Sequence, residues 1–405
     1  MLASLQAAPA DPILGLAEAF RADPSPDKIN LAVGVYKDAE GRTPVLRAVR
    51  DAERRLLEAD ATKAYLPIDG PLPFATQTQR LLLGDALSEL DGDADGQSGR
   101  IRTAATPGGT GALRLAADFL HDGFPDATVW MPDPTWANHG GVLGAAGVRT
   151  ANYRYLDGET QGFDSDGALA DIAQAKPNDL ILLHACCHNP TGVDPTPAQW
   201  QQIADAVNAA GAVPFVDFAY QGFGEDVDAD AEGLRVIART CPEVLIASSY
   251  SKNFGLYQDR VGALTLQARS ADDAQAAWSR VKQAARRNWS NPPAHGPLVV
   301  QTILGDDGLR AAWLDELAQM RNRINSTRAL LRQTLNDAGV TLGPDDNAFI
   351  TRQNGMFTMS GLTPEQVDRL RSDHAIYIVR SGRINVAGIT ERNVGTLAAA
   401  IAQVV

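Results

Sequence analysis

The chain has 405 residues, of which 44% are hydrophobic and 21% charged, and this composition is ordinary for a globular protein with a large core. Its net charge of −13 argues against nucleic acid or an anionic membrane as the main partner. No apolar run approaches the ~20 residues of a membrane-spanning helix, the N-terminus lacks the pattern of a signal peptide, and three cysteines cannot form a disulfide framework. We therefore expect a soluble, cytoplasmic protein.

The N-terminal part predicts mainly helices. Apolar residues recur at helical spacing in three segments, which are 11–21 with Asp11 as its N-cap, 45–60 and 73–90. Residues 29–35 predict a strand broken at Gly34, where a backbone can approach a ligand closely. The polar loop 91–99 begins like a calcium-binding loop, but Arg102 stands where that loop needs a glutamate, so we interpret it as a solvated surface loop.

From residue 102 onward, strands alternate with helices. Short apolar runs predict strands at the start of 102–114 and in 129–136, 180–185, 213–217, 244–247 and 260–266. Helical spacing and capping residues predict helices that end near 123, run from 196 to 211, begin near 229, and cover 270–287 and 307–338, with a rigid turn at 288–296. This alternation predicts a mostly parallel sheet with helices on both faces.

The C-terminal part changes character. It predicts short strands and helices in 355–361, 363–374, 376–379 and 384–387, followed by a terminal helix. We expect it to form a smaller α/β domain together with residues near the N-terminus. The expected division is an N-terminal arm over 1–10, a small domain from 11–43 and 318–405, and a large domain over 44–317.

Lys252 stands where the predicted strand 244–247 gives way to a loop, the usual place for chemistry in an open α/β sheet. In a semi-buried site its ammonium loses hydration, so its pKa falls and the free amine becomes a nucleophile. Ser249, Ser251 and Arg260 surround it with hydroxyls and a fixed positive charge, which also suits a phosphate. The alternative is a solvated loop lysine. The choice between the two depends on whether the rest of the chain supplies residues that act together with Lys252.

Four features at predicted strand ends have to be explained together. They are Asp217 with Tyr220, Asn189 before Pro190, Lys252 with Arg260, and the glycine-rich loop 107–111 that contains Gly109 and Thr110. A carboxylate can pair with a protonated ring nitrogen, a phenol and an amide can hold a ring oxygen, and a lysine can form an imine. An arginine beside the first amides of a helix can hold a phosphate. Together these are the requirements of pyridoxal 5′-phosphate, whose ring acts as an electron sink.

The same stretches resemble the class I aspartate/aromatic aminotransferases, from about residue 11 to the C-terminus. The motifs that carry the resemblance are 189–192 (Asn-Pro-Thr-Gly), 217–220 (Asp-Phe-Ala-Tyr), 249–255 (Ser-Tyr-Ser-Lys-Asn-Phe-Gly) with Arg260, and 381–386 (Ser-Gly-Arg-Ile-Asn-Val). The resemblance implies the fold of type I pyridoxal-phosphate enzymes, with a mostly parallel seven-stranded sheet in the large domain. It also implies a homodimer whose active sites are shared between subunits.

The resemblance further implies ping-pong transamination between aspartate and 2-oxoglutarate. One alternative is an aromatic (tyrosine or phenylalanine) aminotransferase with dual aromatic and dicarboxylate specificity, and another, from a different class, is a non-catalytic binding protein with this fold. Five residues match the aspartate-type pattern, namely Val35, Lys37, Thr43, Thr110 and Asn291. Ala64 does not, because aspartate-selective relatives often carry Asn there.

The resemblance assigns roles to individual residues. The catalytic residues would be Lys252, Asp217 and Tyr220. Further cofactor contacts would be Gly109, Thr110, Trp136, His139, Asn189, Ser249, Ser251, Arg260 and, from the second subunit, Tyr65. Substrate contacts would be Gly34, Trp136, Asn189, Arg383 and, from the second subunit, Arg286.

Taken singly, several of these residues have ordinary explanations: Asp217 could cap a helix, Trp136 could belong to the core, and Arg286 with Arg287 could be a solvated pair. Only their combination indicates a cofactor site. A group of potential metal ligands, His184, Cys186, Cys187 and His188, falls within the strand-to-loop segment that the resemblance covers. We expect no metal there.

Overall fold

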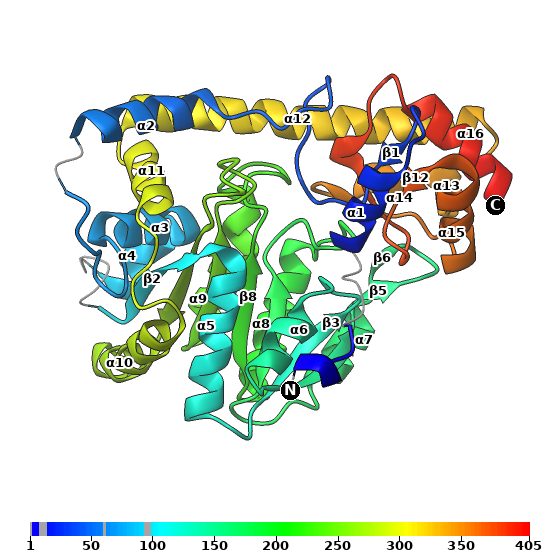
Figure 1. Ribbon diagram of the computed structural model, residues 1–405. Helices are drawn as coiled ribbons and strands as arrows, with labels where there is room; N and C mark the ends of the chain where they lie inside the picture. The colour runs from blue at the N-terminus through cyan, green and yellow to red at the C-terminus, as the bar shows by residue number, and fades with distance from the viewer. Residues whose placement is uncertain (1, 8–13, 60–61, 93–98) are drawn as a thin grey trace.

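The computed structural model describes residues 2–7, 14–59, 62–92 and 99–405. The expected N-cap Asp11 and most of the 91–99 loop therefore lie outside the described residues. The centre is a seven-stranded sheet in the order β2-β10-β9-β8-β7-β3-β4 (Figure 1). Its strands are β2 (Ile101–Pro107), β3 (Thr128–Asp133), β4 (Arg149–Arg154), β7 (Leu180–His184), β8 (Val213–Phe218), β9 (Val244–Ser249) and β10 (Val261–Gln267). This sheet confirms the predicted α/β fold.

Strand direction decides which residues meet at one edge of the sheet. The strands β4, β3, β7, β8 and β9 run parallel to one another, whereas β10 is antiparallel to both of its neighbours, β9 and β2. The start of β10 therefore lies beside the carboxyl ends of the other strands. Arg260, which directly precedes β10, is brought to that edge for this reason.

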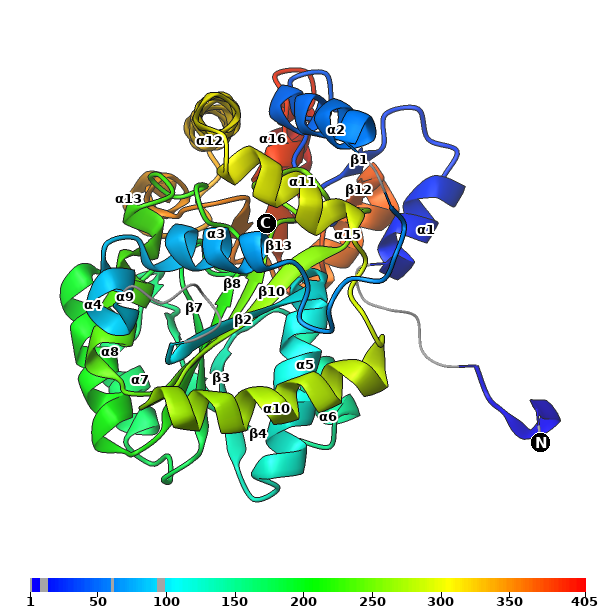
Figure 2. The ribbon, with the colours of Figure 1, turned by 90° about the vertical axis from the view of Figure 1, so that its left-hand side faces the viewer.

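Helices cover both faces of the sheet, as Figures 1 and 2 show. One face packs against α5 (Gly108–Gly123), α6 (His139–Ala145) and α10 (Ala271–Asn288). The other packs against α3 (Leu72–Leu83), α7 (Ser165–Ile172), α8 (Pro197–Ala209) and α9 (Glu232–Thr240). Strand β7 shows why, because Leu180 and Leu182 enter the first cluster while Ile181 and Leu183 enter the second. Alternate side chains of a strand point to opposite faces, so an uninterrupted apolar run needs cover on both.

The long helix α12 (Asp307–Asp337) links the sheet to the C-terminal part. In Figure 1 it crosses the top of the molecule beside α2 (Arg47–Ala59), and it also packs on α11 (His295–Leu304). Its C-terminal half enters a separate hydrophobic cluster with residues of α15 (Pro364–His374) and α16 (Val394–Val404). Two small sheets belong to this end: β1 (Ile29–Asn30) pairs with β12 (Ile376–Tyr377), and β11 (Phe357–Met359) with β13 (Arg383–Asn385).

Several predicted elements are shorter or divided. The predicted helix 73–90 is two helices, α3 and α4 (Ala86–Asp91), because Gly84 takes φ +52° between them. Only Ile29 and Asn30 of the predicted strand 29–35 pair with another strand. The helix α11 was not predicted, since 288–296 indicated only a turn. The remaining elements are η1 (Leu2–Ser4), α1 (Leu14–Ala22), β5 (Leu156–Asp157), β6 (Gly162–Phe163), η2 (Ala229–Ala231), α13 (Pro344–Asn347), α14 (Phe349–Arg352) and η3 (Val386–Gly388).

Within the described ranges, no helix combines the length and the apolarity that a membrane crossing requires.

Candidate active site

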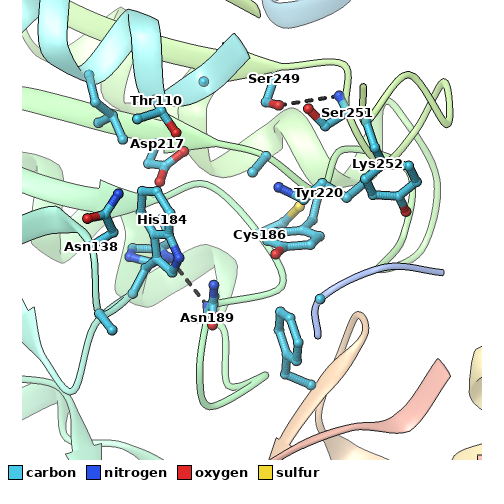
Figure 3. Close-up of a pocket in the computed structure, with 18 of the residues that line it drawn as sticks. Thr110, Asn138, His184, Cys186, Asn189, Asp217, Tyr220, Ser249, Ser251 and Lys252 are labelled. Carbon is cyan, nitrogen blue, oxygen red and sulfur yellow. Dashed lines mark hydrogen bonds between the residues drawn. The ribbon is translucent and has the colours of Figure 1, made fainter. Parts of the chain in front are cut away.

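A cavity of about 640 Å³ opens at the carboxyl edge of the sheet (Figure 3). Twelve predicted site residues line it: Gly34, Gly109, Thr110, Trp136, Asn189, Asp217, Tyr220, Ser249, Ser251, Lys252, Arg260 and Arg383. They come from strand ends and loops that are far apart in the sequence. The structure thus brings together the residues that were singled out at predicted strand ends.

Lys252 lies in the turn that follows β9, and its side chain reaches the cavity (Figure 3). Its Nζ lies 5.0 Å from the centre of the Tyr220 ring. Burial lowers the pKa of Lys252 to about 8, while Asp217 opposes this shift and the charge of Arg260 adds to it. A substantial share of the side chain is therefore a neutral amine near pH 8, as a nucleophile requires.

Asp217, near the end of β8, accepts a hydrogen bond on Oδ2 from Nε2 of His139 at 2.9 Å. Burial alone would raise the pKa of Asp217. The hydrogen bond from His139 and the charges of nearby groups, including Lys252, outweigh burial and hold the pKa of Asp217 below its usual value. The cavity therefore presents a carboxylate that stays ionised, which is what a protonated ring nitrogen would need.

The hydrogen bonds behind Asp217 fix the tautomer of His139. The backbone N–H of Asn189 donates to Nδ1 of His184 at 3.3 Å, so the proton of the neutral His184 ring sits on Nε2. The Nε2–H group of His184 faces Oγ1 of Thr135 at 3.2 Å, so it can donate to that oxygen. The Thr135 hydroxyl can then donate to Nδ1 of His139 at 2.8 Å. The remaining nitrogen of His139 is left as a donor to Asp217. Burial lowers the pKa of His184 to about 3, which keeps this order in place.

The N-terminus of α5 has the geometry of an anion-binding site. This helix of 16 residues begins at Gly108, so its unpaired amides and the positive end of its dipole face the cavity at Gly109 and Thr110. Nη1 of Arg260 donates to the Tyr257 carbonyl at 3.1 Å and to Oγ of Ser251 at 3.4 Å, which holds the guanidinium beside the helix. Gly108 has φ +75°, and a Cβ there would lie 2.5 Å from Arg260. The space between helix and arginine requires glycine.

Arg383, on β13, presents a buried cation to the cavity. Its Nη1 donates to Oδ1 of Asn189 at 3.2 Å and its Nη2 to the Ala32 carbonyl at 2.5 Å. The guanidinium carbon lies 4.2 Å from the centre of the Phe357 ring. Among the described residues, Nε of Arg383 has no hydrogen-bond partner. A carboxylate entering the cavity would meet a guanidinium that is already oriented.

Three predicted contacts do not line this cavity. His139 lies behind Asp217, to which it donates, and the other two are Tyr65 and Arg286. Tyr65 is 92% exposed. Arg286 lies near the end of α10, where it donates to Ser290 and lines a separate hollow with Ile68 and Lys282. The assignments of Tyr65 and Arg286 need a second subunit, as the sequence prediction supposed.

Some contributors were not predicted as site residues. Thr135 acts through His139, whereas Phe357 and Tyr257 both line the cavity and Phe357 also lies against Arg383. Thr135 stands next to the predicted Trp136, so its position in the loop was the available signal. Nothing in the sequence indicates that the Phe357 ring lies under Arg383, because the two are brought together by the pairing of β11 with β13.

Cys186, Cys187 and Asp230 place possible ligand atoms within 4.8 Å of one another. Burial raises the pKa of both thiols. The Asp230 carboxylate accepts backbone N–H groups of Gly222, Gly224 and Glu225 at 2.7–2.9 Å. A carboxylate whose oxygens are bound by three backbone amides is typical of a hydrogen-bonded core.

Comparisons with known proteins show which proteins this chain resembles. The aspartate aminotransferase of Salmonella typhi is 52% identical over 404 residues, covering 100% of each chain. The aromatic-amino-acid aminotransferase of Pseudomonas aeruginosa is 46% identical, covering 98% of this chain and 97% of its own. The crystal structure of the aromatic-amino-acid aminotransferase from Burkholderia pseudomallei, covalently bound to pyridoxal phosphate, superposes with a TM-score of 0.93 at 46% identity, covering 100% of this chain and 99% of its own. Residues 26–401 match the family "Aminotransferase class I and II", and the chain belongs to that family.

Proposed function

We propose that this aminotransferase moves the amino group of aspartate to 2-oxoglutarate, giving oxaloacetate and glutamate in two half-reactions. The observation that carries the proposal is one cavity that holds an amine of lowered pKa, an ionised carboxylate, a helix N-terminus with an arginine, and a second, buried arginine. These groups match the amine, ring-nitrogen, phosphate and substrate-carboxylate contacts that transamination requires.

The residues fit pyridoxal 5′-phosphate as the cofactor. The amides of Gly109 and Thr110 would bind the phosphate together with Arg260. Asp217 would face the ring nitrogen, and Tyr220 with Asn189 the ring oxygen. Trp136 would cover the ring, while Lys252 would be the point of covalent attachment. When bound, the cofactor supplies an electron sink for the substrate α-carbon.

Each protein group then has a defined task. Lys252, with its pKa of about 8, takes a proton from the α-carbon of the amino-acid donor in the first half-reaction and delivers one to the α-carbon of the amino-acid product in the second. Asp217, held as an anion by His139, keeps the ring nitrogen protonated. Burial raises the pKa of Tyr220, so its hydroxyl remains a hydrogen-bond donor. Arg383 clamps the substrate α-carboxylate.

The preference for a dicarboxylate depends on Arg286. We infer a homodimer in which Arg286 and Tyr65 of one subunit complete the site of the other, because neither lies in the cavity of its own chain and both are exposed. The three buried, unpaired cysteines support a cytoplasmic location. The separate cluster around α15 and α16 supports a small domain from 11–43 and 318–405 beside a large one over 44–317.

Dual specificity for aromatic and dicarboxylate substrates is the second candidate. Ala64, where the aspartate-type pattern expects Asn, favours it, and relatives of both kinds are similar over the whole chain.

A spectrum and a substrate panel test the proposal. The purified protein should show a visible absorbance band that shifts when glutamate is added, and aspartate should give the highest kcat/KM with 2-oxoglutarate as acceptor. A band that does not respond to any amino acid would indicate a binding protein. A higher kcat/KM for tyrosine or phenylalanine would favour the aromatic alternative.

A further inference from the structure

Asp194 lies behind the cavity wall, in the loop that follows β7, and does not line the cavity. Its carboxylate accepts the backbone N–H of Cys187 on Oδ2 at 2.9 Å and that of His188 on Oδ1 at 3.0 Å. These two residues directly precede Asn189. Because both amides are tied to one carboxylate, Asp194 fixes the path of the backbone that delivers the Asn189 side chain to the cavity.

The same carboxylate reaches the C-terminal part of the chain. Oδ2 of Asp194 accepts a third hydrogen bond, from Nδ2 of Asn354 at 3.1 Å, across 160 residues of sequence. The backbone N–H of Asn354 donates to the Gly192 carbonyl at 2.7 Å. Gly192 has φ +72°, and a Cβ there would lie 2.8 Å from the Phe357 carbonyl oxygen. The loop 187–194 and the loop 354–357 therefore contact each other through their backbones, and the Asp194 carboxylate lies between them.

Arg328, on α12, holds the second loop from its other side. Nη1 of this fully buried guanidinium donates to the Ile350 carbonyl at 2.9 Å, and Nη2 donates to the carbonyls of Gly355 at 2.8 Å and Phe357 at 2.5 Å. No described carboxylate pairs with Arg328. Its charge orders the backbone that ends at the Phe357 ring.

Both loops meet at Arg383. The first supplies Oδ1 of Asn189, which accepts from Nη1, and the second supplies the Phe357 ring beneath the guanidinium. The geometry points to Asp194 as a positioning residue that keeps these two supports of Arg383 in register, so that the guanidinium is preorganised for the substrate α-carboxylate. This inference rests on the proposed function, because it takes Arg383 to bind the α-carboxylate.

A purely structural role is the alternative, and the chain offers a matched control. Asp179 stands before β7 and Asp194 after it. Like Asp194, Asp179 accepts three hydrogen bonds, from the backbone N–H groups of Thr128 and Lys176, both at 2.9 Å, and from the Trp130 indole at 3.1 Å. It lies at the amino end of the strand and does not line the cavity. Loss of an Asp179 acceptor should cost stability without reaching Arg383.

The test compares Asp194→Asn with Asp179→Asn, each as purified holoenzyme. Burial raises the pKa of Asp194 to about 6, so assays at pH 8 keep the carboxylate of the parent ionised. Each substitution puts an amide donor against a backbone N–H, and both should lower the melting temperature. Only Asp194→Asn should raise KM, by ~10-fold, as expected for one lost hydrogen bond to a charged group, with kcat changed less than ~3-fold.

The rise in KM should be equal for aspartate and phenylalanine, because the α-carboxylate is common to both. Should Asp194→Asn not fold, Asn354→Ala removes only the side-chain bond between the loops and should raise both KM values by ~3-fold. An Asp194→Asn or Asn354→Ala enzyme with unchanged KM, or one matching Asp179→Asn, would overturn the inference. Absence of transamination in the parent enzyme would instead reject the proposed function, so the two failures are distinguishable.

Discussion

Two regions of the molecule carry positive charge near candidate ligand sites, and they differ in burial. The cavity around Lys252 encloses its arginine Arg383, fixes it by hydrogen bonds and lowers the pKa of Lys252. The hollow beside α10 presents Arg286 and Arg287 at the surface, where Arg286 donates to Ser290 and Arg287 pairs with Asp122. The cavity is enclosed by the residues of a single chain, whereas the hollow beside α10 is open to solvent.

This difference in burial separates the residues proposed for catalysis from the residue proposed for substrate choice. Groups that must shift their pKa or hold one orientation are buried, since only a desolvated site makes such interactions strong. Arg286 requires neither, because its proposed task is to meet a distal carboxylate in the neighbouring subunit. We therefore expect variants of the cavity to lose turnover with every substrate, and variants of the hollow to lose activity only with dicarboxylates.

The largest effect is expected for Lys252→Ala. Turnover should fall by more than ~10⁴-fold, because the variant loses both a covalent attachment point and a general base, and the base alone contributes ~10²–10⁴-fold. The cofactor should remain bound, since Asp217, Arg260 and the α5 N-terminus are unchanged. Steady-state rates and the visible spectrum measure the two outcomes. The exposed-surface control Lys176→Ala should keep its activity, and near-parental turnover in Lys252→Ala would contradict the assignment.

Asp217→Ala should reduce kcat by ~10²–10³-fold, the usual cost of one preorganised electrostatic group, with a much smaller change in KM. The physical reason is that the ring nitrogen loses the anion that keeps it protonated. Stopped-flow measurement of the first half-reaction follows the slowed proton transfer. A normal kcat with a raised KM would show that Asp217 contributes only uniform binding.

The sequence predicted the cavity better than its supports. Asp217 ends a strand-like run, Lys252 and Asn189 follow shortly after two others, and a parallel sheet brings such ends to one edge. The position of Arg260 could be predicted as part of a motif, but its reason, the reversed direction of β10, could not. The contacts of Arg383 with Asn189 and Phe357, and those of Thr135 with two histidines, join segments whose meeting depends on tertiary packing. Local sequence patterns therefore could not predict these contacts.

Arg286→Ala tests the second region. Removal of a cation from a bound carboxylate should lower kcat/KM for aspartate and glutamate by ~30–150-fold, corresponding to ~2–3 kcal/mol. Phenylalanine, which places no charge there, should lose little. Arg287→Ala is the matched control, because Arg287 is the next residue of α10 and pairs with Asp122. Equal losses for aspartate and phenylalanine would reject the role of Arg286 in specificity.

Mixed dimers test whether the hollow serves a neighbouring subunit. If equal amounts of Arg286→Ala and Arg383→Ala chains exchange at random, half of the dimers are mixed, and each mixed dimer has one site with both arginines. About a quarter of the parental dicarboxylate activity should then return. Mixed dimers that are present, as native mass spectrometry can establish, but remain inactive would show that each site is built from one chain.

The smallest effect expected is a displaced titration of Lys252 in the cofactor-free protein. Its pKa near 8 lies below the usual value because burial disfavours the charged amine, so reaction with an amine-directed reagent should rise with a midpoint near pH 8. Exposed lysines should react only at higher pH.

Since Asp217 raises the pKa of Lys252, Asp217→Ala should move the midpoint lower, whereas removal of the Arg383 charge should move it higher. The lowered pKa of Lys252 also makes the stability of the folded protein depend on pH. Because the unfolded chain binds this proton more tightly than the folded one, the contribution to stability is complete above the unfolded pKa of 10.5 and is lost as the pH falls through about 8. Peptide mass spectrometry of the labelled protein gives the midpoint, and a value near that of exposed lysines would show that the cavity does not desolvate Lys252.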